Sequence, residues 1–240
     1  MRGVLLMACA GPMQSWGTRS RFQERDTERE PTKSGVVGML CAALGRDRSE
    51  PVGDLTALKM GVRVDREGVL RKDFQTAKDV IVASGKSWED LISSRYYLAD
   101  AAFLVGLEGD LATLRLLHAA LAKPRWHLFL GRKSYLPSIP PFLGDGLLEG
   151  ADLESALRSY PLLVPEGRTS VQEKGTASGG NYLRLRLVVE SYSPTSESRK
   201  DQPVSFAEGG RVFHDRYLET SFINIESSND AGGAACSSPS

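Results

Sequence analysis

The sequence has little cysteine, no long apolar run and no net charge. Its three cysteines are an odd number without metal-ligand spacing, so we expect neither a disulfide framework nor a metal or cofactor site. No apolar stretch approaches ~18 residues, so no helix is expected to span a membrane. These absences favour a globular protein of the reducing cytoplasm, and 240 residues provide an ample core.

The absence of a net charge conceals an uneven distribution along the chain. Residues 1–135 carry 21 Lys and Arg against 16 Asp and Glu, whereas residues 136–240 carry 9 against 14. Between Leu111 and Gly144 there are five basic residues and no acidic residue. This asymmetry is typical of a basic face on the first part of the chain, and an ordinary solvated surface is the alternative.

Hydrophobic periodicity predicts an α+β fold. The expected elements are a buried strand at Val4–Ala10, a helix at Ser34–Leu44, strands at Leu58–Val64 and Tyr97–Leu107, a helix that begins after Asp110 and ends before Pro124, and a strand at Trp126–Leu130. Their order, β-α-β-β-α-β, is that of ferredoxin-like domains and RNA-recognition motifs. In the first helix, Gly35, Gly38 and Ala42 share one side and are expected to pack closely on a sheet.

Two regions extend this arrangement. About 30 excess residues at about 65–95 separate the second and third strands, which is too long for a simple turn and predicts a projecting arm. We therefore expect a ferredoxin-like domain at 1–145 with this arm, a small β-rich region at 146–226 and a disordered tail at 227–240. The expected elements of the second region are a helix at Asp152–Ser159, a polar loop near 193–203 and a strand at Leu183–Ser191.

A loop after the first strand reads GPMQSWGTRSRFQERDTEREPTKSG over residues 11–35. It combines a tryptophan with amide, hydroxyl and cationic side chains, namely Gln14, Ser15, Trp16, Arg19 and Arg21. An aromatic ring among cations can stack on an RNA base, which is worth about 1–3 kcal/mol per base. A lone tryptophan in a loop can equally be a lid over the core, and both interpretations remain open here.

The end of this loop, Thr32-Lys33-Ser34-Gly35, resembles part of a phosphate-binding loop. That motif requires glycine directly before the lysine and again five residues earlier, where this sequence has Thr32 and Thr27. We therefore expect no nucleotide hydrolysis at this site. Thr32 or Ser34 can instead cap the following helix, whose free N–H groups and Lys33 would then bind one backbone phosphate.

A second basic segment, KPRWHLFLGRKSY, begins at Lys123. It carries Arg125, Arg132 and Lys133 around a predicted strand of the same sheet as Val4–Ala10. Both basic loops are therefore expected to border one face and to contact RNA there, with a solvated surface as the alternative.

The scattered histidines support a weaker alternative function. His118 lies on the outer side of a helix and His214 near the end, whereas His127 lies in the basic segment with Lys123 and Tyr135. Metal-independent RNA cleavage needs a group that deprotonates the 2′-hydroxyl and a cation for the phosphorane charge, and histidine with lysine would suffice. A structural histidine is the other interpretation of one such ring on an alternating strand.

Several segments, in this order, resemble a known family. They are GPMQSWG, PTKSGVVGMLCAALGRDR, YLADAAFLVGL, KPRWHLFLGRKSY and PPFLG, in register to about residue 145, with a weaker continuation in QPVSFAEGGRVFHDRYLE. They resemble the family-five subunit of the subtype I-E CRISPR surveillance complex, Cascade, which belongs to the RAMP superfamily. The resemblance implies a ferredoxin-like RAMP domain, with the arm at 65–95 as its thumb.

The resemblance also implies a function, that of a non-catalytic subunit that binds and caps the 5′ handle of CRISPR RNA. The implied partners are this RNA, the backbone subunit CasC, the large subunit CasA and, through the complex, target DNA. In this subtype a separate subunit, CasE, processes the precursor RNA, but relatives in subtype I-C cleave RNA, so an endoribonuclease using His127 stays the alternative. By position, the implied RNA contacts are Gln14, Ser15, Trp16, Arg19, Lys33, Ser34, Arg46, Arg48, Arg132, Lys133 and Ser134, and the basic pattern adds Arg21 and Arg125.

Overall fold

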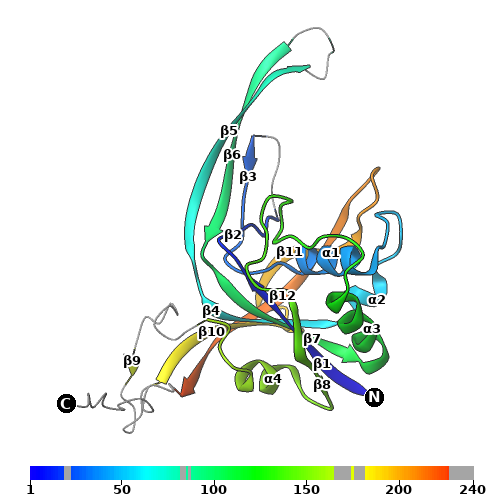
Figure 1. Ribbon diagram of the computed structural model, residues 1–240, viewed down its shortest axis with the longest axis vertical. Helices are drawn as coiled ribbons and strands as arrows, with labels where there is room; N and C mark the ends of the chain where they lie inside the picture. The colour runs from blue at the N-terminus through cyan, green and yellow to red at the C-terminus, as the bar shows by residue number, and fades with distance from the viewer. Residues whose placement is uncertain (19–22, 82–84, 86–87, 165–173, 176–181, 227–240) are drawn as a thin grey trace, which may run out of the picture.

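The computed structural model describes residues 1–18, 23–81, 85, 88–164, 174–175 and 182–226. They form an α+β fold in which one large sheet carries helices and a long hairpin projects from the body (Figure 1). Arg19, Arg21 and the tail predicted at 227–240 lie outside the described residues. No described helix has the length and apolar character needed to cross a membrane.

The first part of the chain has the expected order of elements, β-α-β-β-α-β. These elements are β1 (Arg2–Ala10), α1 (Lys33–Leu44), β4 (Lys59–Arg66), β7 (Ala102–Asp110), α3 (Leu111–Ala122) and β8 (Phe142–Glu149). A short helix, α2 (Gly53–Thr56), separates α1 from β4. The strands are antiparallel and lie in the order β4-β7-β1-β8, so β1 lies between two neighbours, as its uninterrupted apolar run predicted.

The C-terminal strands extend the same sheet beyond β4. They are β10 (Tyr182–Ser191), β11 (Glu197–Ser205) and β12 (Val212–Glu226), with the short β9 (Lys174–Gly175) paired to β10. The sheet order is β11-β12-β10-β4-β7-β1-β8. The regions that the sequence separates at residue 145 therefore share one continuous sheet, and β8 runs through that residue. The helix α4 (Leu153–Ser159) follows β8, where a helix was expected at Asp152–Ser159, and Asp152 caps it.

The strand predicted at Trp126–Leu130 is absent from this fully described segment, and β8 is the fourth strand. The N–H groups of Arg125 and Trp126 instead donate to the carbonyl oxygens of Ala43 and Ala42 at the end of α1, at 2.9 and 3.1 Å. The buried apolar residues of this segment are anchors of an irregular loop. Leu128 and Leu130 turn inward, whereas Trp126, which a strand would place on the same side, is 49% exposed.

Two other predictions, one of a strand and one of a loop, are wrong. Tyr97–Leu107 is not one strand, because Asp100 has a left-handed backbone (φ 56°) between β6 (Trp88–Ala99) and β7. The polar loop predicted near 193–203 is wrong from Glu197 onward, because β11 (Glu197–Ser205) begins there. The polar sequence of β11 concealed it, because Arg199 pairs with the buried Glu30, and Asp201, which has no exposed surface, pairs with Arg216.

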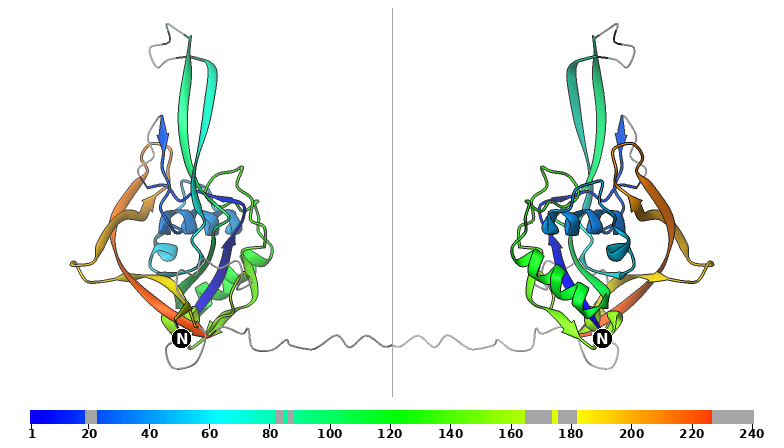
Figure 2. Two further views of the ribbon diagram at one scale, coloured as in Figure 1. Left: turned by 90° about the vertical axis from the view of Figure 1, so that its left-hand side faces the viewer. Right: turned by 90° about the vertical axis from the view of Figure 1, so that its right-hand side faces the viewer.

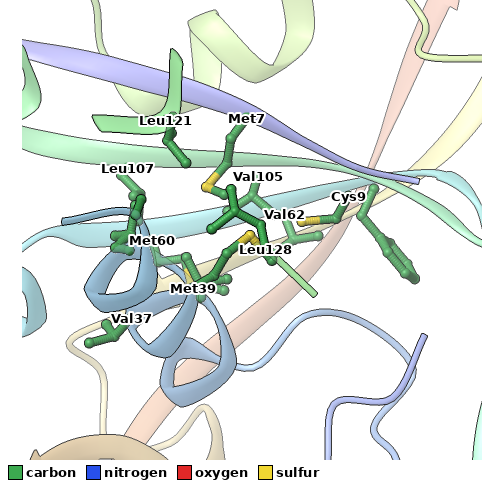
Figure 3. Packing of buried hydrophobic residues seen from close by; sticks show 14 of the residues in the cluster. Met7, Cys9, Val37, Met39, Met60, Val62, Val105, Leu107, Leu121 and Leu128 are labelled. Carbon is green, nitrogen blue, oxygen red and sulfur yellow. The ribbon is translucent and has the colours of Figure 1, made fainter. Parts of the chain in front are cut away.

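The core has two layers, one on each face of the sheet. On one face, α1 and α3 cover Met7 and Cys9 of β1, and Met39 of α1 packs into the same cluster (Figure 3). On the other face, α4 covers Val4 and Leu6. Alternate residues of β1 thus enter different cores, which is why its sequence is apolar without interruption.

The insertion expected at about 65–95 is an antiparallel hairpin of β5 (Val69–Ile81) and β6, which projects from the body (Figure 2). At its base, two short strands of the first loop, β2 (Met13–Gln14) and β3 (Glu24–Arg25), pair with β6. The first loop and the hairpin therefore form a second, smaller sheet, and the hairpin fixes the course of the loop.

A buried cluster of charges joins the C-terminal strands to the loop before α1. Glu30 is 2% exposed and lies 2.6 Å from both Arg186 of β10 and Arg199 of β11. Arg186 also pairs with Glu67 at 2.7 Å. Burial alone would raise the pKa of Glu30, but the two arginines outweigh it and hold this pKa below its usual 4.5.

This lowered pKa predicts that acid destabilises the fold through Glu30. Because the unfolded chain binds a proton at higher pH than the folded chain, the stabilisation is complete above about pH 4.5 and is lost as the pH falls through the folded pKa. Urea unfolding measured from neutral pH down to acid should show a steeper decline for the wild type than for Glu30→Gln. Parallel curves for the two proteins would contradict this role of Glu30.

Candidate nucleic-acid interface

The polar side chains at the start of the first loop face inward. Gln14 is fully buried; its Nε2 donates to the carbonyl oxygens of Cys9 and Ala101 at 3.0 and 2.8 Å, and its Oε1 accepts from Trp16 Nε1 at 3.2 Å. Trp16 is 1% exposed and belongs to the core, and Ser15 is 5% exposed. The lid interpretation of Trp16 is therefore correct. The side chains of Gln14, Ser15 and Trp16 have protein partners and little accessible surface, which leaves them little to offer to the RNA contacts predicted from the sequence.

Lys33 is also buried and presents no charge to solvent. Its Nζ lies 2.9 Å from Glu190 Oε2, and its backbone N–H donates to Asp201 Oδ2 at 2.9 Å. Burial, opposed by the attraction of Glu190, lowers the pKa of Lys33. Thr32 caps α1 as predicted. The phosphate predicted at this helix start has no place, because the carboxylate of Asp201 already binds there.

The two distant turns do converge. The N–H of Ser15 donates to the carbonyl oxygen of Leu130 at 3.1 Å, so the second basic turn lies directly against the first loop. Arg132 binds this junction together: its guanidinium donates to the Tyr135 hydroxyl at 2.9 Å and to the carbonyl oxygen of Tyr96 at 3.0 Å. Arg132 therefore holds the turns in place.

A groove of about 980 Å³ opens beside α1. It brings together five of the predicted RNA contacts from three segments, namely Ser34, Arg46, Arg48, Arg125 and Lys133. Sequence reasoning missed four residues that also line it, namely Trp126, Phe129, Phe206 and Arg211. Phe206 and Arg211 lie in the segment QPVSFAEGGRVFHDRYLE, whose weak family resemblance was the available signal.

The groove is strongly positive. Arg125, Lys133 and Arg211 have no ion-pair partner among the described residues, whereas Arg46 is paired with Asp54 at 2.5 Å. Asp47 is the single acidic residue among the described ones that line the groove, and Ser49 donates to its carboxylate at 2.8 Å. Unpaired cations beside partly exposed aromatic rings are the combination that single-stranded RNA requires.

The structure separates the residues of the nuclease alternative. His127 is exposed and lines the groove. Tyr135, the predicted companion of His127 in acid-base chemistry, is 5% exposed, and its hydroxyl accepts a hydrogen bond from Arg132, which leaves it little access to a substrate. Lys123 and Ser134 are exposed but are not among the residues that line the groove. In the part of the chain that the structure describes, no group of side chains is arranged to hold a metal ion.

Comparison with known proteins reveals the family. The family model described as CRISPR-associated protein (Cas_Cas5) matches residues 4–218. The chain belongs to this family. CRISPR system Cascade subunit CasD of Escherichia coli (strain K12) is 35% identical over 178 residues, which cover 67% of this chain and 78% of that protein. The resemblance found in the sequence is thereby confirmed.

Solved structures support the same family. One, described as "Crystal structure of Cas protein", has a TM-score of 0.70 and 47% identity, over 91% of this chain and 94% of that chain. A chain of a "CRISPR RNA-guided surveillance complex" has a TM-score of 0.76 and 32% identity, over 93% of this chain and 91% of that chain. The similarity therefore includes the C-terminal strands as well as the first part of the fold.

Proposed function

We propose that this member of the family is a non-catalytic Cascade subunit that binds and caps the 5′ handle of CRISPR RNA. The observation that carries the proposal is the groove, where cations from the loop after α1, from the 124–133 segment and from the β11–β12 turn meet. A splayed single strand suits such a groove, because its bases and 2′-hydroxyls are accessible to side chains. The similarity to CasD supports the choice of RNA and complex.

The arrangement of the elements suggests the position of the subunit in the complex. We infer that the strand order β4-β7-β1-β8 with α1 and α3 is the ferredoxin-like RAMP domain, within residues 1–145, and that the β5–β6 hairpin is its thumb. Residues 146–226 complete the sheet. The thumb would extend toward the first spacer nucleotides and CasC, with CasA nearby and target DNA reached through the complex, in the cytoplasm.

The salt dependence of RNA binding tests this proposal. If roughly five phosphates are neutralised, the logarithmic slope should be about −3.5, a loss of about 100-fold in affinity between about 50 and 200 mM salt. Lys133→Ala should weaken binding and flatten the slope by about 0.7, since one phosphate contact is lost. The measurement is a fluorescence anisotropy titration with RNA that co-purifies with the complex.

Arg158→Ala is the matched control, because Arg158 is an exposed arginine on α4, at the opposite face of the sheet. Its affinity and slope should equal those of the wild type. Equal weakening in both variants would remove the groove as the binding site. The same titration in EDTA should return intact RNA; discrete cleavage that disappears in His127→Ala would favour the endoribonuclease instead.

A further inference from the structure

Gly38 occupies the middle of α1, where the fold gives no reason for a glycine. Glycine is among the least favourable residues in a helix interior. At Gly35, one turn earlier, packing explains it, because a Cβ would come within 2.7 Å of the Trp16 ring. At Gly38 a Cβ would meet no atom within 4 Å, so the close packing that the sequence predicted at this residue is absent. The space over Gly38 is open, and it belongs to the groove.

Gly38 and Ala42 form a flat strip of helix surface within the groove. Ala42 follows Gly38 by one turn on the same side of α1 and also lines the groove, so no long side chain rises from this strip. Trp126 is 49% exposed, yet its backbone N–H is fixed to the carbonyl oxygen of Ala42 at 3.1 Å. The exposed ring of Trp126 therefore lies beside this strip, and its backbone is anchored to α1. Phe206, from the end of β11, lines the groove as well.

The positive charges around this strip complement the phosphates of a nucleotide. Arg125, Lys133 and Arg211 line the same groove and have no ion-pair partner in the described part of the chain. The stem of Arg125 lies against Gly45, where a Cβ would come within 2.6 Å of it, so this cation is held near the end of α1. An apolar surface beside an aromatic ring can bind a base, and unpaired cations next to it can bind the flanking phosphates.

We propose that the strip at Gly38 is the seat of one unstacked RNA base, which lies over the helix and stacks on Trp126. The inference rests on the proposed function, since it states how the groove holds part of the RNA. In this proposal, glycine is required at position 38 because it leaves space for the base, and not because the fold needs it. Because every base has a π face, the seat holds a nucleotide by shape and stacking and tolerates different bases.

Substitutions at Gly38 separate ligand from fold. Gly38→Ala should raise the melting temperature by about 2–4 °C, since alanine is the better helix former. Gly38→Leu should fill the seat and weaken binding of the co-purifying RNA by about 5- to 150-fold, the range that corresponds to the loss of one stacked base. Gly53→Leu is the control, because a Cβ there also meets no atom within 4 Å and Gly53 is not among the residues lining the groove.

Fluorescence locates the base independently. In a set of RNAs with the co-purifying sequence, each carries 2-aminopurine at one position, and stacking on a ring quenches this fluorophore. The wild type should quench one position most strongly, and the quenching should be lost in Trp126→Ala and Gly38→Leu and retained in Trp126→Tyr. If Gly38→Leu keeps the affinity and quenching of the wild type while Lys133→Ala binds more weakly, the proposed base-binding site at Gly38 is wrong and the proposed function stands. A wild type that binds no RNA would overturn the seat and the proposed function together.

Discussion

The Arg63→Ala variant is expected to be about 3–5 kcal/mol less stable than the wild type, because it leaves a buried charge without its partner. Arg63 and Asp65 both have no exposed surface, and Arg63 Nε lies 2.6 Å from Asp65 Oδ1. The guanidinium also donates to the carbonyl oxygens of Leu157, Tyr160 and Pro161 at 2.6, 2.5 and 2.8 Å. These carbonyls lie at the end of α4 and directly after it, and alanine would leave them unsatisfied as well.

Urea unfolding followed by circular dichroism measures this loss. Arg158→Ala, also at the end of α4 but exposed, should change the free energy of unfolding by less than about 0.5 kcal/mol. The double variant Arg63→Met/Asp65→Leu should recover part of the loss, since it removes the isolated charge. It leaves unpaired the three carbonyls and also the N–H of Leu163, which donates to Asp65 Oδ2 at 2.8 Å. A loss below about 1 kcal/mol in Arg63→Ala would show that the carboxylate finds another partner.

The sequence predicted the elements whose signals are local. The uninterrupted apolar run of β1, the Thr32 cap and the helix that begins after Asp110 each depend on a few adjacent residues, and each is present in the structure. The strand at Trp126–Leu130 was mispredicted because burial of Leu128 and Leu130 does not require strand pairing. Only the hydrogen bonds of Arg125 and Trp126 to the end of α1 distinguish this segment, and they are contacts distant in sequence.

The candidate site follows the same division. The convergence of the two turns was predicted, but the direction of individual side chains was not. Lys33 was predicted to bind phosphate because nothing near it in the sequence indicates its partners. These partners, Glu190 and Asp201, lie 157 and 168 residues away along the chain. Arg211 was not predicted as a site residue for the same reason. It reaches the groove from the turn between β11 and β12, and the polar sequence of β11 did not indicate a strand.

Removing the three unpaired cations of the groove together is expected to weaken RNA binding on the order of 1000-fold. The variant is Arg125→Gln/Lys133→Gln/Arg211→Gln, in which glutamine removes the charge and keeps part of the stem. Three lost hydrogen bonds to phosphate, at about 1.5 kcal/mol each, amount to about 4.5 kcal/mol. The measurement is the anisotropy titration at one fixed salt concentration, with the co-purifying RNA as ligand.

The control removes the same charge from the rest of the surface. Arg2, Arg115 and Arg158 are exposed arginines that pair with glutamates and do not line the groove, and the triple glutamine variant of these residues has the same net charge. If binding depends on the groove, this control should retain affinity within a few-fold of the wild type. If both triple variants lose affinity alike, long-range attraction by the whole positive half of the chain binds the RNA, and the groove has no special part in it. A single variant, Arg211→Gln, then distinguishes geometry from total charge, because Arg211 comes from the negatively charged half of the sequence and contributes only through its position at the groove.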